Sequence, residues 1–261
     1  MPDRLAELAA IAADAGDIIA AALGGAENVE KKAAVNLVTE VDHAAERLLI
    51  DAIRALYPND AIVAEETASS RPPAGRCWYI DPLDGTTNFV HGLPHCSVSL
   101  GLLDDSGPLA AVVHDPCKGE TFVAERGSGC WLGEQRLAAC STAELEDALL
   151  VTGFPYDRRD HVDFYLQYFK EFLLKARDVR RFGSAALDLA YVAAGRFDGF
   201  WEWKLSPWDT AAGWLLVEEA GGCVSDFDGG PYDPWAPRIL ACGQRLHAPM
   251  VAALAALPPA P

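Results

Sequence analysis

The chain has 261 residues, 51% hydrophobic and 23% charged, and this composition excludes an intrinsically disordered protein because it supplies a sizeable core. No run of about 18 apolar residues occurs and the N-terminal segment lacks the apolar block of a signal peptide, so we expect a cytoplasmic protein without a membrane span. A net charge of −17 argues against a general nucleic-acid binder, because such proteins carry a basic surface.

The first half of the chain predicts two helices followed by β-structure. Apolar residues recur at helical spacing over residues 4–23 and 42–56. Short apolar runs at 61–64 and 77–80 indicate strands. An antiparallel meander is expected next, because three β-rich runs are separated by turn residues, at 96–103, 109–114 and 121–125.

The second half mixes helices and strands. Helices are expected at about 160–176, 184–194, 209–220 and 245–256. Strands are expected near 149–153, 197–203, 223–227 and 239–242. This order predicts a layered α+β fold, with an antiparallel sheet in the first half and a mixed sheet in the second. Because no composition break marks a boundary, residues 1–261 are expected to form one unit with approximate halves 1–145 and 146–261.

The seven cysteines are scattered along the chain and include no Cys-x-x-Cys pair. Zinc sites and disulfide frameworks need tighter spacing than this. Most of the cysteines lie inside apolar runs, so we expect reduced, buried packing residues.

The segment from Trp78 to Asn88 places oxygen ligands at the end of an apolar strand. Pro82 favours an extended Asp81 and Gly85 permits a turn, so the carboxylates of Asp81 and Asp84 can converge with the Leu83 carbonyl between them. Hard oxygens of this kind suit Mg²⁺, and free N–H groups of residues 85–87 at a helix start would suit a phosphate. In the alternative interpretation, Asp-Pro and Asp-Gly are turn dipeptides and Asp84 caps a helix.

Further carboxylates lie where predicted strands or turns meet helices. Glu65 and Glu66 follow a strand, and two adjacent buried carboxylates are costly without a cation. Asp209 stands at a helix start, and Asp42 precedes another helix, so each is either a cap or a site residue. Clustered carboxylates must be neutralised by protonation, by Arg or Lys, or by metal ions.

Together these motifs resemble the inositol monophosphatase family, whose members are Mg²⁺-dependent, Li⁺-sensitive sugar phosphatases. The resemblance spans roughly residues 5–255, and the 180–213 stretch is most similar to the bacterial inositol-1-monophosphatase branch. It is carried by Glu65-Glu66, Asp81-Pro-Leu-Asp-Gly-Thr-Thr-Asn88, Trp208-Asp-Thr-Ala-Ala-Gly213 and Glu219-Ala-Gly-Gly222. It implies a five-layered αβαβα sandwich that is commonly a homodimer.

The resemblance also implies a role for each matching residue. Two or three Mg²⁺ ions would be held by Glu65, Asp81, the Leu83 carbonyl, Asp84 and Asp209. Thr86, Asp42 and Glu65 would form the catalytic set, with Thr86 and Asp42 orienting and deprotonating the attacking water. Substrate contacts would come from Leu83, Asp84, Gly85, Thr86, Arg180, Ala185, Glu202 and Asp209. For the Arg180-Arg181 pair, substrate contact and dimer contact remain open.

The expected reaction is in-line attack of water on a phosphomonoester, with inositol-1-phosphate or a related sugar phosphate as the small-molecule substrate. Fructose-1,6-bisphosphate and histidinol phosphate are alternative substrates, because relatives with similar motifs hydrolyse them. A different class also stays open, because some bacterial members of this branch bind the transcription machinery. This chain is therefore either a phosphatase or a regulatory protein with that kind of partner.

Overall fold

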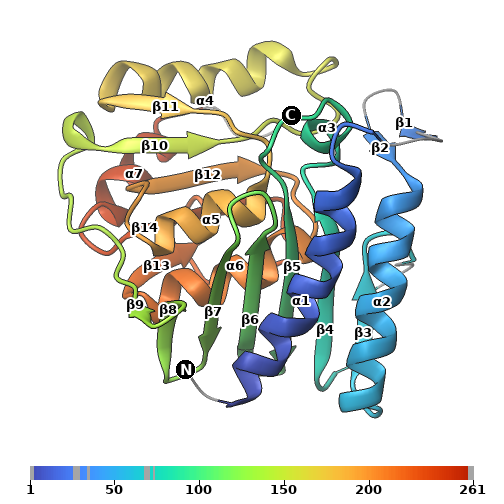
Figure 1. The fold of residues 1–261 in the computed structure, drawn as a ribbon. Coiled ribbons are helices and arrows are strands. Elements are labelled where there is room, and N and C mark those ends of the chain that lie inside the picture. Colours follow the sequence, from blue (N-terminus) through green and yellow to red (C-terminus); the bar gives the residue numbers. More distant parts are fainter. Residues whose placement is uncertain (1–2, 26–29, 34–35, 68–70, 73, 258–261) are drawn as a thin grey trace.

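The computed structural model describes residues 3–25, 30–33, 36–67, 71–72 and 74–257, and it shows two sheets and their helices in alternating layers (Figure 1). Amphipathic runs form the helices at nearly the expected positions. They are α1 (Asp3–Ala22), α2 (Glu40–Leu56), α3 (Thr86–Val90), α4 (Val162–Lys175), α5 (Ala185–Ala193), α6 (Pro207–Glu219) and α7 (His247–Ala255), with a short 3₁₀ turn at Leu145–Asp147. No helix in the described ranges is both long and apolar enough to cross a membrane.

The first half of the chain builds a seven-stranded sheet with the strands in sequence order. Its strands are β3 (Ala61–Ala64), β4 (Cys77–Asp84), β5 (Ser97–Asp104), β6 (Gly107–Asp115), β7 (Glu120–Glu125), β8 (Gly129–Leu132) and β9 (Gln135–Arg136). The expected antiparallel pairing holds from β4 to β9, but β3 and β4 are parallel. The 12-residue connection between them explains the difference, since parallel neighbours need a crossover of about a dozen residues.

The second half builds a mixed five-stranded sheet in the order β11-β10-β12-β14-β13. These strands are β10 (Leu149–Thr152), β11 (Asp178–Arg180), β12 (Gly199–Trp203), β13 (Gly222–Ser225) and β14 (Arg238–Gly243). A separate antiparallel pair, β1 (Glu30–Ala33) and β2 (Asn36–Val38), precedes α2 and was not expected from the sequence.

Five layers follow from where the helices pack. Helices α1 and α2 cover the outer face of the seven-stranded sheet, α5 and α6 lie between the sheets, and α4 and α7 cover the outer face of the five-stranded sheet (Figure 1). Each interface has its own buried cluster, with Leu49 and Trp78 outside the first sheet, Leu189 and Phe200 in the middle, and Phe172 outside the second. The expected α+β sandwich is therefore confirmed. All seven cysteines are free, and four of them are buried.

Candidate active site

Two aspartates at the end of β4 form the centre of the candidate site. Asp81 pairs with Ser99 of β5 and Asp84 pairs with Ser97, and the register shifts between these two pairs. Asp81 therefore lies inside a strand that runs on to Asp84, and not after the strand as the sequence suggested. Its Oδ1 accepts a hydrogen bond from the Leu83 N–H at 3.0 Å, and its side chain is only 2% exposed.

Asp84 joins the two halves of the chain. Its Oδ2 accepts hydrogen bonds from the Ser184 hydroxyl at 2.6 Å and from the Ala186 N–H at 2.8 Å. Ser184 is also the N-cap of α5, where its Oγ accepts the Leu187 N–H. Asp84 thus lies against the N-terminal turn of a helix in the middle layer, whose partial positive charge favours a carboxylate.

Asp209 and Glu65 reach the same region from two other elements. Asp209 is the third residue of α6, and its Oδ2 accepts the Ser206 N–H at 2.7 Å in a capping box. The N-cap is therefore Ser206, not Asp209, although Asp209 does stabilise the helix start. Glu65 directly follows β3, and its N–H donates to the Ile80 carbonyl of β4.

These four carboxylates act on one another electrostatically. Burial raises the pKa of Asp81 well above its usual value, and the charges of Glu65, Asp84 and Asp209 raise it further. The pKa of Asp209 is raised in the same way, by burial and then by Asp84 and Glu65. Burial also raises the pKa of Asp84 to about 6, although its hydrogen bonds with Ser184 and Ala186 oppose the shift. The carboxylates thus lie close enough to act on one another's pKa values.

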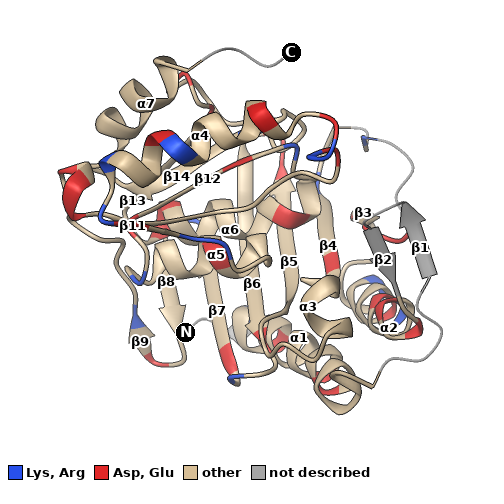
Figure 2. Ribbon diagram, turned by 90° about the horizontal axis from the view of Figure 1, so that it is seen from above, with Lys and Arg blue, Asp and Glu red and all other residues tan. Residues whose placement is uncertain are grey.

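The charge of the chain as a whole does not relieve this repulsion. Acidic residues are spread over the helices and loops around both sheets (Figure 2). The chain as a whole carries 38 Asp and Glu against 21 Lys and Arg. Because like charges disfavour ionisation of their neighbours, such a cluster needs a bound cation or protons to stay stable at neutral pH.

Thr86 and Asp42 meet beside the cluster. The Thr86 hydroxyl lies 3.3 Å from Asp42 Oδ1 and 3.1 Å from the Leu83 carbonyl, so it can donate to either oxygen. Asp42 is fully buried and closes a capping box with Thr39 at the start of α2. The N-cap of α2 is therefore Thr39, Asp42 stabilises the helix start, and the site role of Asp42 stays a prediction.

Gly85 fixes the turn that leads from β4 into α3. It is the N-cap of α3 and has φ +93°, a conformation that side chains other than glycine rarely adopt. A Cβ atom at this position would lie 3.1 Å from the His95 carbonyl oxygen. Glycine therefore lets the first N–H groups of α3 lie beside Asp84 and Thr86.

Glu202 on β12 approaches the cluster from the second sheet. Its carboxylate packs directly on Gly153, where any Cβ atom would collide with it. Burial raises the pKa of Glu202 to about 8; the charge of Arg181 opposes this shift and that of Asp84 adds to it. Glu202 is therefore largely protonated at neutral pH, so its carboxyl can donate a hydrogen bond as well as accept one.

The adjacent arginines have different surroundings. Arg180, the predicted substrate contact, ion-pairs with Asp178 on its own strand and donates to the Val179 carbonyl. Its neighbour Arg181 is the one whose charge acts on Asp84 and Glu202. The structure thus brings Arg181 toward the site, whereas Arg180 makes local contacts.

Two further residues near the cluster were not predicted. Asp188 on α5 is 1% exposed, its Oδ1 is buried with no hydrogen-bond partner among the described residues, and burial together with the charge of Glu202 raises its pKa. Tyr156 is 60% exposed as a whole, but burial of its hydroxyl end and the charge of Asp209 raise its pKa. From the sequence, only the nearby Ala185 was expected at the site, and neither Asp188 nor Tyr156 was singled out.

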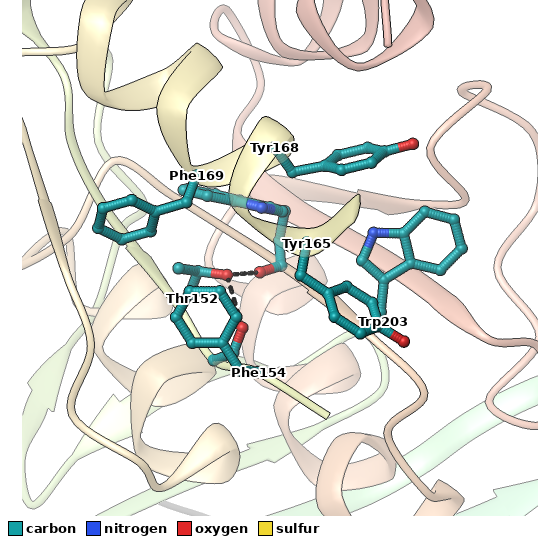
Figure 3. A pocket seen from close by; sticks show the side chains of 8 residues that line it. Thr152, Phe154, Tyr165, Tyr168, Phe169 and Trp203 are labelled. Atoms are coloured by element: carbon teal, nitrogen blue, oxygen red, sulfur yellow. Dashed lines mark hydrogen bonds between the residues drawn. The ribbon is translucent and has the colours of Figure 1, made fainter. Parts of the chain in front are cut away.

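A small cavity behind β12 differs from the site in its chemistry. Tyr165, Tyr168 and Phe169 of α4 line it, together with Phe154 and Trp203 (Figure 3). The Thr152 hydroxyl closes one side by donating to the Trp201 carbonyl. No acidic side chain lines this cavity, so it belongs to the apolar core on which β12 rests.

The donor set of the cluster suits a hard cation, but its geometry is not a closed cage. Asp81, Asp84 and Asp209 each use one carboxylate oxygen for a protein N–H or O–H, which leaves the second oxygen outside those hydrogen bonds. With the side chains as they lie, the described part of the chain contains no set of three His, Cys, Asp or Glu side chains arranged to hold a metal ion. The predicted metal roles therefore stay predictions.

Comparison with known proteins agrees with the fold and the motifs. The model of the inositol monophosphatase family matches residues 2–257. A protein named Nus factor SuhB from Pseudomonas aeruginosa is 50% identical over 207 residues, which cover 77% of this chain and 76% of that protein. The inositol-1-monophosphatase of a Synechocystis strain is 44% identical over 230 residues, covering 88% and 80% of the two chains.

A solved structure extends the agreement to the whole architecture. The structure of an IMPase from Thermotoga maritima superimposes with a TM-score of 0.89 at 36% identity, covering 98% of each chain. The fold, the matched residues and the identity to these relatives all lead to one assignment: the chain belongs to the inositol monophosphatase family.

Proposed function

We propose that this chain is a Mg²⁺-dependent phosphatase that hydrolyses inositol-1-phosphate or a related sugar phosphate. The observation that carries the proposal is the cluster of Glu65, Asp81, Asp84 and Asp209, four carboxylates from three parts of the fold whose charges raise the pKa values of Asp81 and Asp209. Buried carboxylates that repel one another are neutralised by protons or by a bound cation, and a cation would leave all four ionised. Membership of the inositol monophosphatase family supports the reaction class.

The proposed Mg²⁺ ligands are the cluster carboxylates and the Leu83 carbonyl, because all of them are hard oxygens. When bound, Mg²⁺ would supply Lewis-acid activation of water and phosphate, and its charge would offset that of the anionic substrate. Two or three ions would neutralise the four carboxylates. This also explains how a chain with a net charge of −17 can bind a phosphate.

The remaining steps belong to the chain's own residues. The first N–H groups of α3, from Gly85 and Thr86, would donate to phosphate oxygens. The Thr86 hydroxyl, which lies 3.3 Å from Asp42 Oδ1, would orient the attacking water and relay its proton toward Asp42. Glu202 and the backbone near Ala185 would hydrogen-bond the hydroxyl groups of the polyol. We propose Arg181 rather than Arg180 as the nearby positive charge.

Metal dependence is the direct test of this function. Phosphate release from inositol-1-phosphate should disappear after chelation with EDTA and removal of the chelator, and should return when Mg²⁺ is added. The melting temperature should rise with Mg²⁺ in wild type, because a ligand that binds only the folded state stabilises it, but should rise much less in Asp81→Asn. Turnover that persists after rigorous chelation would contradict the proposal.

The substrate is proposed at the level of a polyol phosphate, and a panel would refine it. Inositol-1-phosphate, fructose-1,6-bisphosphate and histidinol phosphate should be compared by kcat/KM at saturating Mg²⁺. We expect the highest value for inositol-1-phosphate, because Glu202 can both donate and accept hydrogen bonds toward ring hydroxyls. Inhibition by Li⁺ is measured on the same preparation. The mass in solution, measured in parallel, tests the expected homodimer.

The comparisons give specific support to a second function, association with the transcription machinery. Relatives named Nus factor SuhB are 44–50% identical to this chain over about three quarters of its length or more. Affinity capture with the tagged protein in an extract of its own cells should then recover RNA polymerase in stoichiometric amount. Asp84→Asn should recover the same amount, because this substitution affects catalysis and leaves the surface intact. Absence of polymerase from both captures would contradict this second function.

A further inference from the structure

Two cysteines from different turns meet beside the candidate site. Cys96 immediately precedes β5 and is fully buried, and Cys117 lies half-buried in the turn between β6 and β7. Their sulfur atoms are 3.9 Å apart. They are the only two of the chain's seven cysteines, all described, whose thiols are in contact.

The sheet register explains why they meet. Val98 of β5 is opposite His114 of β6, and continuing this antiparallel pairing by two residues sets position 96 opposite position 116. Cys117 is the next residue along. The sulfur atoms of the two residues are 3.9 Å apart, so a disulfide bond of about 2 Å requires the two cysteines to move toward each other.

The turn that carries Cys117 is firmly held. One carboxylate oxygen of Asp115 accepts the N–H groups of Cys117 and Lys118, and the other forms an ion pair with the Lys118 ammonium group. The position of the Cys117 sulfur is therefore set by the turn and does not depend on a flexible loop. Because Cys117 is only half-buried, a small molecule can reach it where Cys96 is closed to solvent.

We infer that Cys96 and Cys117 form a redox pair that a hydroperoxide converts to a disulfide. The Cys117 thiolate attacks the peroxide, which gives a sulfenic acid at Cys117 and releases hydroxide. The Cys96 thiol then attacks the Cys117 sulfur and displaces the hydroxyl group as water. In total, two thiols lose two protons and two electrons, and one hydrogen peroxide is reduced to two waters.

The reaction is slow at neutral pH and becomes faster as the pH rises. Burial raises the pKa of both thiols, and the charge of Asp115 raises both further. The charge of Asp84 adds to the shift at Cys96, whereas that of Lys118 opposes the shift at Cys117. Little thiolate is therefore present at pH 7. The thiolate is the nucleophile, and its fraction grows about tenfold per pH unit below the pKa. The pair therefore responds to strong oxidation and stays reduced under ordinary cytoplasmic conditions.

The disulfide would act on the candidate site through Gly85. The Cα atom of Cys96 would lie 3.3 Å from a Cβ atom placed on Gly85, so the two backbones are already in contact. Any shift of Cys96 toward Cys117 therefore moves a residue packed against the turn that starts α3. This consequence rests on the proposed function, because it requires the Gly85 turn to bind phosphate, and it predicts that oxidation lowers turnover.

Peptide mapping of the full-length protein tests the pair without any activity assay. Reduced, desalted protein is treated with hydrogen peroxide at pH 7 and pH 8.5, quenched in acid, alkylated and digested without reductant. We expect a peptide linked through Cys96 and Cys117, two fewer free thiols, reversal by dithiothreitol, and more product at pH 8.5. Cys117→Ser should give no such peptide, and Cys223→Ser should still give it.

Several results would overturn the inference. A sulfinic acid at Cys117 without any link would show that Cys96 cannot reach it. Cys223 and Cys242 are register partners on β13 and β14. A disulfide between them would show that any two cysteines on opposite strand positions are oxidised, so that the Cys96–Cys117 pair is not special. If the Cys96–Cys117 link forms but phosphate release is unchanged, the coupling to Gly85 is wrong. If the reduced protein has no phosphatase activity at all, the proposed function fails while the peptide map still decides the redox pair.

Discussion

On one face of β12, Trp201 and Trp203 pack against the aromatic side chains of α4, and on the other face Glu202 lies among carboxylates. Side chains alternate along a strand, so neighbouring residues serve opposite purposes. The aromatic face removes apolar surface from water and stabilises the fold. The acidic face buries groups whose pKa values are raised by burial and mutual repulsion, which costs stability. The comparison indicates that the second face is kept for function.

Among the substitutions, Asp84→Asn should show most strongly that the acidic face serves activity and not stability. We expect phosphate release to fall by at least about three orders of magnitude, because the substitution removes one of the proposed metal-binding charges. The metal-free variant should nevertheless be more stable than wild type above pH 6, because one of the repelling charges is gone. Initial rates at saturating Mg²⁺ and denaturant melts in EDTA measure the two effects.

The matched control for this substitution is Asp147→Asn, since Asp147 is exposed and pairs with Arg177 far from the cluster. It should change neither rate nor stability appreciably. Near-normal turnover in Asp84→Asn would remove Asp84 from the metal site.

Phe172→Ala tests the aromatic face. Phe172 is fully buried on α4, with its ring centroid 4.2 Å from that of Trp201. Its truncation should lower the free energy of unfolding by about 3–5 kcal/mol. The folded fraction should keep most of its turnover, because the change lies on the far side of β12. Leu174→Ala on the same helix is the control, since Leu174 is 74% exposed and should change stability little. Equal losses in both variants would contradict the assigned core.

The sequence could suggest only the local part of the candidate site. Asp81, Leu83 and Asp84 are close in the chain, so one Pro and one Gly were enough to suggest that their oxygens converge. The contact of Asp84 with Ser184, 100 residues later, could not be predicted because it depends on how the two sheets stack. The same limit applies to Arg180 and Arg181, because which of two adjacent arginines reaches a cluster depends on where β11 ends.

In the fold, too, the local features could be predicted from the sequence and the long-range ones could not. The periodicity located α1, α2 and α4–α7 and most long strands within a few residues. The parallel pairing of β3 with β4 was missed because strand direction depends on the path of the connecting loop. The strands β9 and β11 were missed because two or three residues carry no readable period, and the four-residue β8, which begins at Gly129, was also missed. The aromatic residues Tyr165, Tyr168 and Phe172 of α4 lie in the core.

Thr86→Ala should lower kcat by about 100-fold while affecting Mg²⁺ affinity much less. A hydroxyl that orients the attacking water acts mainly in the transition state, whereas the metal ligands are unchanged. Thr86→Ser, which keeps the hydroxyl beside Asp42 and Leu83, should recover most of the rate. Steady-state kinetics over a Mg²⁺ titration gives both quantities. A parallel loss of metal affinity in Thr86→Ala would make Thr86 a structural residue.

The smallest expected effect is the pH dependence of stability that Glu202 causes on the acidic face of β12. Its pKa is raised to about 8 in the folded protein from an ordinary value of 4.5, so between these values the folded state holds a proton that the unfolded state lacks. Stability therefore falls as the pH rises through 8. Between pH 7 and 9, the free energy of unfolding of metal-free wild type should fall by roughly 1 kcal/mol more than that of Glu202→Gln, which carries no titrating group at this position.

The control is Glu218→Gln, an exposed position on α6, which should follow wild type. If urea melts show the same pH slope in all three proteins, Glu202 is not the buried acid that the structure indicates, and the acidic face of β12 loses its distinction from the aromatic one.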